Sequence, residues 1–285
     1  MTLLRSTALL AALALGACAG PMDEPPQLSG DDQPINVIDA SSLNELMLTV
    51  SDPDDAVSYF QRALNEDPGR VDYQRGYALA LARARRYGEA AEQFEALEQD
   101  GAANDRIRIE HAHSLARLER WPEADAQMAQ VSAGADSARR YLIDAMLADQ
   151  RSDWTAADIA YEQARRHSAN PARILNNWGV SKMSRGETEA AAKTFEEALS
   201  FDPRLFNAKN NLAVARALKG EYRLPLVSMT EVERAIMLHN IGVIALRRGD
   251  VREAKGLFTM AIAAHPQYYP EAAEKLAALE ASVLN

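Results

Sequence analysis

Residues 172–205 read ARILNNWGVSKMSRGETEAAAKTFEEALSFDPRL. Within this stretch Ala191, Phe195, Ala198 and Pro203 form a short frame, in which a large residue follows the first alanine by four positions and a small residue follows it by seven. Positions four and seven apart lie on one face of a helix, and proline ends a helix because it lacks a backbone donor. The first alanine of the frame recurs along the chain, mostly at intervals of 34 residues, at Ala56, Ala90, Ala124, Ala157, Ala191 and Ala254.

A period of 34 with this frame is typical of the tetratricopeptide repeat, a helix–turn–helix unit. One repeat cannot bury its apolar face alone, so neighbouring repeats must stack. The composition agrees, since 47% of the residues are hydrophobic and only 6% are aromatic. We therefore predict an all-α fold, a right-handed superhelical solenoid of about six to seven repeats over residues 40–285, with a capping helix over 270–283.

The sixth repeat, over residues 206–229, breaks the pattern. Pro225 occupies the position of the frame alanine, and Ala254 follows Ala191 by 63 residues, where two full periods would give 68. Thr230 and Glu233 have the spacing of a capping box, which predicts that a new helix begins there. The sequence does not decide whether the segment 224–229 is a rigid kink or a hinge.

The first 39 residues predict a membrane anchor. Arg5 precedes a short apolar run, and Leu15-Gly16-Ala17-Cys18 matches the lipobox of bacterial lipoproteins. We expect residues 1–17 to be a signal peptide that is removed, Cys18 to carry acyl chains, and residues 18–39 to form a flexible tether. The alternative is an ordinary secretory signal with an incidental cysteine. By resemblance to the sorting rule of Gram-negative lipoproteins, Ala19 favours the outer membrane, with the protein on its periplasmic face.

The sequence contains none of the usual catalytic patterns. It has no phosphate-binding glycine loop, no His-Glu-x-x-His and no Gly-x-Ser-x-Gly, and His111 and His113 are spaced wrongly for a metal pair on a helix. We therefore expect no enzyme activity, no catalytic or metal-binding residues, no cofactor and no small-molecule substrate. Trp121, Trp154 and Trp178 fall on positions expected to pack in the core.

The charge of the chain argues against binding to nucleic acid. The formal net charge is −10, which disfavours a phosphate-binding surface over the whole body. Small basic clusters occur at Arg83-Ala84-Arg85-Arg86 and at Arg247-Arg248. Cations near the end of a helix interact well with its dipole, and this explanation is favoured over a patch for a partner.

Asparagines recur at one position of the last three repeats. Asn177, Asn211 and Asn240 each occupy the sixth position, which faces the concave groove in tetratricopeptide folds. An amide ladder there can bond the backbone of an extended peptide, and Val180, Val214 and Val243 can supply an apolar floor. The alternative is that these amides bond within the array.

Residues 174–279 resemble the tetratricopeptide lipoprotein of tight-adherence (Flp, or Tad) pilus systems. The resemblance rests on NNWGVSKMSRGETEAAAKTFEEAL (176–199), the break PLVSMTEVER (225–234) and the tail HNIGVIALRRGDVREAKGLFTMAIAAHPQYYPEAAEKLAALE (239–280), whereas residues 37–170 resemble only generic repeats. It implies a pilotin-like factor that helps the outer-membrane pilus secretin to assemble, with the secretin and other pilus-assembly components as partners. The alternative is a periplasmic adaptor that recruits envelope enzymes such as peptidoglycan hydrolases; a catalytic role of the chain itself is the least favoured hypothesis.

Overall fold

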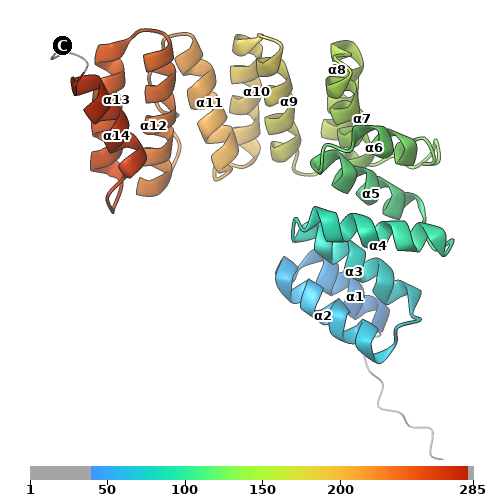
Figure 1. The fold of residues 1–285 in the computed structure, drawn as a ribbon. Helices are drawn as coiled ribbons and strands as arrows, with labels where there is room; N and C mark the ends of the chain where they lie inside the picture. The colour runs from blue at the N-terminus through green and yellow to red at the C-terminus, as the bar shows by residue number, and fades with distance from the viewer. Residues whose placement is uncertain (1–39, 282–285) are drawn as a thin grey trace, which may run out of the picture. The chain divides into compact units, whose positions relative to one another are not determined.

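The computed structural model describes residues 40–281, and the account below concerns the compact unit that begins at Asn44. The predicted signal peptide 1–17, the tether 18–39 and the lipidation site Cys18 lie outside the described residues. The described part contains fourteen α-helices and no strand (Figure 1). Their bounds are α1 Ala40–Thr49, α2 Pro53–Glu66, α3 Val71–Arg83, α4 Tyr87–Gln99, α5 Asp105–Arg117, α6 Trp121–Met128, α7 Ala138–Gln150, α8 Trp154–Arg166, α9 Ala172–Ser184, α10 Thr188–Phe201, α11 Phe206–Leu218, α12 Glu231–Arg247, α13 Val251–Ala264 and α14 Pro270–Ala281.

The helices pack in successive pairs, and this arrangement confirms the predicted all-α repeat fold. The pairs are α3 and α4, α5 and α6, α7 and α8, α9 and α10, and α12 and α13. In the first repeat, the hydroxyl of Tyr59 on α2 donates to Oδ1 of Asn44 on α1. The first helices of neighbouring repeats also touch one another directly, as α3 does with α5, α5 with α7, and α9 with α11. We call the surface formed by these first helices the first-helix face.

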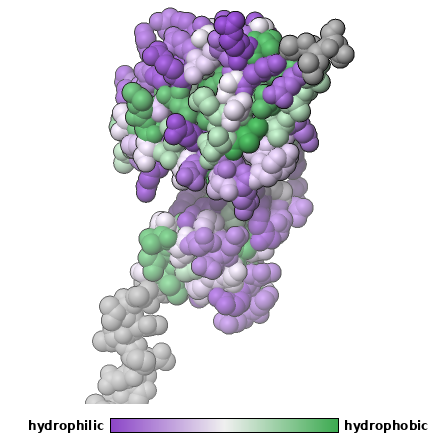
Figure 2. All heavy atoms as spheres, turned by 90° about the vertical axis from the view of Figure 1, so that its left-hand side faces the viewer, coloured by the Kyte–Doolittle hydropathy of each residue, from purple (hydrophilic) through white to green (hydrophobic). Residues whose placement is uncertain are grey.

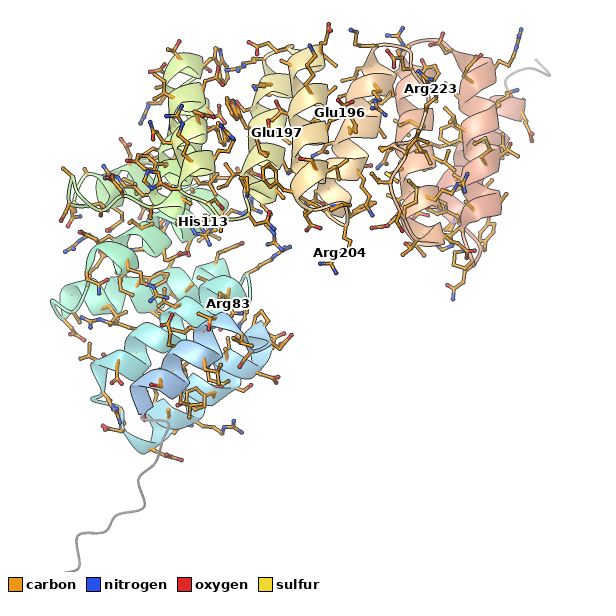
Figure 3. All side chains as sticks on the ribbon, turned by 180° about the vertical axis from the view of Figure 1, so that it is seen from behind. Arg83, His113, Glu196, Glu197, Arg204 and Arg223 are labelled. Atoms are coloured by element: carbon orange, nitrogen blue, oxygen red, sulfur yellow. The ribbon has the colours of Figure 1, made fainter. Side chains whose placement is uncertain are left out.

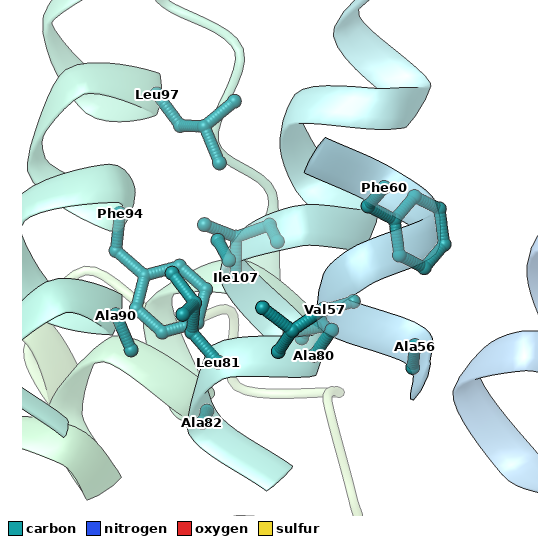
Figure 4. Packing of buried hydrophobic residues seen from close by; sticks show 12 residues of the cluster. Ala56, Val57, Phe60, Ala80, Leu81, Ala82, Ala90, Phe94, Leu97 and Ile107 are labelled. Atoms are coloured by element: carbon teal, nitrogen blue, oxygen red, sulfur yellow. The ribbon is translucent and has the colours of Figure 1, made fainter. Parts of the chain in front are cut away.

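The frame residues lie in the core, as their spacing predicts. Every frame alanine is fully buried, and so are the four phenylalanines that follow a frame alanine: Phe60, Phe94, Phe195 and Phe258. Figure 4 shows how Phe60 and Phe94 pack with the frame alanines among the aliphatic side chains of the first repeats. The alanines permit close approach of two helices, and the phenylalanines fill the space left between them.

The irregular sixth repeat has a first helix but no second one. After α11 no helix forms until α12 begins at Glu231, where Thr230 and Glu233 make a complete capping box. Lys209 of α11 is only 2% exposed, and its Nζ donates to the carbonyl of Ser228 (2.7 Å) and to Oε2 of Glu233 (3.1 Å). At the other end of the segment, the hydroxyl of Tyr222 donates to Asp250. The segment therefore has defined polar contacts at both ends.

The surface of the C-terminal end is mostly polar. Figure 2 shows hydrophilic side chains over most of this face, with smaller apolar patches between them. Between residues 40 and 281, no helix combines the length and hydropathy needed to cross a bilayer.

Candidate functional site

The first-helix face carries a basic hollow of about 280 Å³, which we call the arginine pocket. All of its lining residues come from first helices, namely α1, α3, α5 and α7. Its apolar lining residues are Leu48, Leu79 and Ala82, and its charged ones are three arginines and one glutamate: Arg83, Arg106, Arg139 and Glu110.

The three arginines differ in how they are held. Arg83 donates from Nη1 to the carbonyl of Met47 and from Nη2 to the carbonyl of Ser51, both at 3.0 Å. These acceptors are neutral, so they fix the guanidinium group without cancelling its charge.

The other two arginines pair with carboxylates. Arg139 Nε lies 3.1 Å from Glu110 Oε1, whereas Arg106 Nη1 lies 3.8 Å from Glu45 Oε2 in an exposed pair. Exposed pairs of this kind contribute little to stability, because water screens them. The pocket consequently keeps an excess of positive charge.

A neutral histidine lies beside the pocket. Nη1 of Arg139 is 3.5 Å from Nε2 of His113 on α5. Burial, assisted by the guanidinium groups of Arg139 and Arg117, lowers the pKa of His113 to about 3. Figure 3 labels His113 together with Arg83 of the neighbouring helix α3. At neutral pH the positive charge of this region thus comes from arginine alone.

A second hollow, of about 300 Å³, lies further along the same face, and we call it the tryptophan hollow. It is lined by residues of the first helices α5, α7 and α9, together with Trp121 of α6 and Trp154 and Tyr161 of α8. Its lining combines aromatic and apolar side chains with a few polar groups, among them Trp121, Trp154, Tyr161, Met146, Asp149 and Arg117. Binding pockets commonly have this mixture.

The polar groups of the tryptophan hollow are fixed by hydrogen bonds. Tyr161 Oη donates to Oδ2 of Asp149 (2.8 Å), and Ser181 Oγ donates to Oδ1 (2.6 Å). Burial raises the pKa of Asp149, and these two donors oppose the rise.

The helices α8 and α9 are joined by further contacts next to this hollow. Trp178 Nε1 donates to Asp158 Oδ1 (2.5 Å), and Arg185 Nη2 donates to both oxygens of Asp158 at 2.8 and 2.9 Å. The ammonium group of Lys182 lies 3.8 Å from the centre of the Trp178 ring, close enough for a cation–π interaction. The wall of the hollow that α9 supplies is therefore held in place.

The six predicted groove residues fall into three pairs. Asn177 and Val180 line the tryptophan hollow, and Val180 is 41% exposed. Val214 and Val243 are half-buried, and Val243 packs against the C-terminal core.

The remaining two asparagines bond across repeats. Asn211 Nδ2 donates to Asn176 Oδ1 (3.0 Å), and Asn240 Nδ2 donates to Asn210 Oδ1 (2.7 Å). These two amides thus bond within the array, which is the alternative interpretation given for the asparagines. Peptide binding by Asn177, Asn211 and Asn240 together stays a prediction.

Two features of the site can be compared with what residue patterns suggested. The two hollows described above involve repeats one to five, and the asparagine pattern includes repeat five, whose Asn177 and Val180 line the tryptophan hollow. Arg83 lies in the last turn of α3, as a cation that complements the helix dipole should, and it also lines the arginine pocket. Among the described residues, no group of histidine, cysteine, aspartate and glutamate side chains is arranged to hold a metal ion.

Comparisons with known proteins agree with the repeat assignment. The family model of the tetratricopeptide repeat matches residues 48–105, the range that contains α2, α3 and α4. No curated protein matches the chain.

Several solved structures have a similar fold. A chain of the human IFIT1 dimer with PPP-AAAA has a TM-score of 0.58 at 16% identity, over 81% of this chain and 60% of that chain. A chain of the APC/C hetero-tetramer Cut9–Hcn1 has a TM-score of 0.55 at 16% identity, over 87% of this chain and 50% of that chain. A tetratricopeptide repeat protein from Parabacteroides merdae ATCC 43184 has a TM-score of 0.50 at 13% identity, over 84% of this chain and 96% of that chain.

These similarities concern the fold. The chain spans only half the length of the matched chain of the Cut9–Hcn1 assembly. Together with the repeat period and the helix pairs, the comparisons confirm a tetratricopeptide-repeat solenoid.

Proposed function

We propose that this protein is a binding scaffold whose first-helix face holds an extended segment of a client protein. The observation that carries the proposal is the presence of two hollows on this one face, both of which include residues of α5. Extended peptides bind such faces through backbone hydrogen bonds and side-chain pockets. In this proposal the chain acts by binding, without catalysis or a cofactor.

We further propose that the scaffold is lipid-anchored at the periplasmic face of the outer membrane and assists assembly of the Flp/Tad pilus secretin. The support is the lipobox that ends at Cys18 and the resemblance of residues 174–279 to the lipoprotein of these pilus systems. The acyl chains keep the array at the membrane, where the face shields an exposed strand or tail of the secretin from aggregation.

A crosslinked capture from the native envelope, followed by mass spectrometry, tests the client. The wild-type chain is compared with Val180→Glu, which places a charge in the tryptophan hollow, and with Ile159→Glu as the matched control. Ile159 is 61% exposed on α8 and does not line the hollow, so the same change there leaves the face intact.

The proposal expects the secretin to dominate the wild-type and Ile159→Glu captures and to be depleted with Val180→Glu. A peptidoglycan hydrolase captured with the same dependence on Val180 would replace the pilus assignment with the adaptor hypothesis. Equal capture by all three chains would contradict binding through this face.

Membrane attachment is tested separately by Cys18→Ser. The variant should fold normally and move from the membrane fraction to the soluble periplasmic fraction, since the acyl chains supply the anchor. Retention of Cys18→Ser in the membrane fraction would refute lipidation at this residue.

A further inference from the structure

We propose that the arginine pocket binds carboxylate side chains, so that the client segment held by this face is acidic. This inference rests on the proposed function, because it names the chemistry of the segment that the scaffold holds.

The first argument is local charge. The chain as a whole has a formal net charge of −10, yet the charged residues lining this pocket are three arginines and one glutamate. A positive pocket on an acidic body attracts an anionic segment to one place and repels it elsewhere. The charge complementarity therefore favours an acidic peptide over a basic or neutral one.

The second argument is the state of Arg83. Its two hydrogen bonds to the carbonyls of Met47 and Ser51 use two of the five N–H donors of a guanidinium group. The group is thus held in place by neutral acceptors, with donors remaining. Such a group binds a carboxylate with little further loss of side-chain freedom.

The third argument is the availability of Arg106. Its side chain is 57% exposed, and its 3.8 Å contact with Glu45 joins two exposed groups. An incoming carboxylate can displace so weak a pair and accept two parallel hydrogen bonds from the guanidinium group. The pocket therefore has one cation that is held in place, Arg83, and one that can adjust to a ligand, Arg106.

The fourth argument is the connection to the tryptophan hollow. Arg106 and Glu110 line the arginine pocket, Arg117 lines the tryptophan hollow, and His113 lies between them on the same helix α5. From Arg106 to Arg117 the axis of α5 rises about 16 Å, which an extended chain covers with about five residues. The face therefore fits a segment in which an acidic pair and a large apolar residue lie about five positions apart.

Fluorescence anisotropy with labelled peptides tests this inference on the purified full-length protein. The probe is the peptide EEGGGGWG with an amidated C-terminus, so that its only carboxylates are side chains, and the control is QQGGGGWG, which has the same shape without charge. We expect the acidic peptide to bind at least about tenfold more tightly than the neutral one, as hydrogen bonds to charged groups allow.

Two matched variants assign the effect to the pocket. Arg106→Gln removes one pocket cation and should weaken binding of the acidic peptide about tenfold, with no effect on the neutral peptide. Arg252→Gln makes the same charge change at an exposed position of α13, outside the pocket, and should bind like the wild type. Circular dichroism checks that both variants fold.

Equal affinity for the two peptides, no binding of either, or equal weakening by Arg106→Gln and Arg252→Gln would overturn the inference. Its failure is distinguishable from that of the proposed function. The capture experiment does not depend on the acidity of the client, and the peptide experiment does not depend on the client's identity.

Discussion

At Gly179 the backbone of α9 lies directly against the ring of Phe195. A Cβ atom added to this glycine would lie 2.4 Å from Cε1 of that ring, far inside van der Waals contact. Gly242 has the same arrangement within its repeat, with a Cβ 2.8 Å from Phe258. At Gly76 a Cβ would lie 2.2 Å from Phe60 of the preceding repeat. The glycine is thus the complement of the frame phenylalanine, and the pair sets how closely two helices approach.

We therefore expect Gly179→Ala to lower the free energy of unfolding by about 1–3 kcal/mol, the usual cost of overpacking a core. Urea unfolding followed by circular dichroism measures it. The matched control is Gly256→Ala in α13, where an added Cβ meets nothing within 4 Å. There the substitution should raise stability by about 0.5–1 kcal/mol, because alanine favours the helix. Unchanged or raised stability of Gly179→Ala would show that α9 moves away from Phe195 at no cost.

His113 makes a prediction about pH. An unfolded histidine has a pKa near 6.5, whereas burial, with Arg139 and Arg117 nearby, lowers the pKa of His113 in the folded protein to about 3. The unfolded chain binds this proton at a pH where the folded chain does not. Stability from this residue is therefore complete above about pH 6.5 and is lost as the pH falls toward about 3.

The loss at pH 5 should be on the order of 2 kcal/mol. Burial also lowers the pKa of His239, which acts in the same direction. Unfolding free energies from about pH 7 to about pH 5 should fall more steeply for the wild type than for His113→Gln, which cannot take up the proton. Identical slopes for the two proteins would contradict a neutral, buried His113.

Among the elements, the sixth repeat is the most informative, because its second helix is missing. Pro225 stands where the second helix of the sixth repeat would carry its frame alanine, and proline disrupts a helix interior. The segment between α11 and α12 is instead held by Lys209, whose ammonium group contacts Ser228 and Glu233. Glu233 also closes the capping box of α12, so one carboxylate serves both the segment and the start of the next helix.

Lys209→Met should lower the free energy of unfolding by about 2–4 kcal/mol. The substitution leaves the Ser228 carbonyl without this donor and Glu233 without its cation, and breaking a buried ion pair is costly. Hydrogen exchange over residues 221–233 should also become faster. Lys219→Met is the matched control, because its pair with Glu189 (3.3 Å) is exposed and contributes less than about 1 kcal/mol. If the two variants lose equal stability, the buried contact does not hold the segment.

At the scale of the whole molecule, the sequence predicted the repeats and their packing positions better than the site. The frame residues Ala191 and Phe195 could be predicted because each repeat places them by the same local spacing. The arginine pocket could not, since Arg83, Arg106 and Arg139 come from three helices and meet only through stacking. In the sequence, the pocket corresponds only to the recurrence of arginine on successive first helices. That pattern cannot be distinguished from arginines that are simply exposed to solvent.

The asparagines show a second limit of the same kind. Their shared sixth position was a property of the sequence, but their hydrogen bonds depend on how far apart neighbouring repeats lie. Asn211 and Asn240 reach an asparagine of the preceding repeat, whereas Asn177 lines a hollow. Periodicity thus indicates which face a polar residue lies on, and packing between repeats decides what it binds.

The end of the array is closed by α14. Ala272 of this helix is fully buried, and Leu276 packs against the C-terminal core formed largely by α12 and α13. The stability of a repeat array is approximately the sum of the stabilities of its repeats and of the interfaces between neighbouring repeats. A substitution at one end therefore destabilises mainly the repeats at that end.

Leu276→Asp puts a charge into this contact and should cost about 2 kcal/mol or more. We expect hydrogen exchange to become faster over residues 231–264, with little change over residues 71–117, because the loss spreads only through neighbouring interfaces. Ala277→Asp is the matched control, since Ala277 is exposed on the same helix. Faster exchange along the whole array with Leu276→Asp would instead show that the repeats unfold as one cooperative unit, and an equal effect of Ala277→Asp would show that α14 is not docked through Leu276.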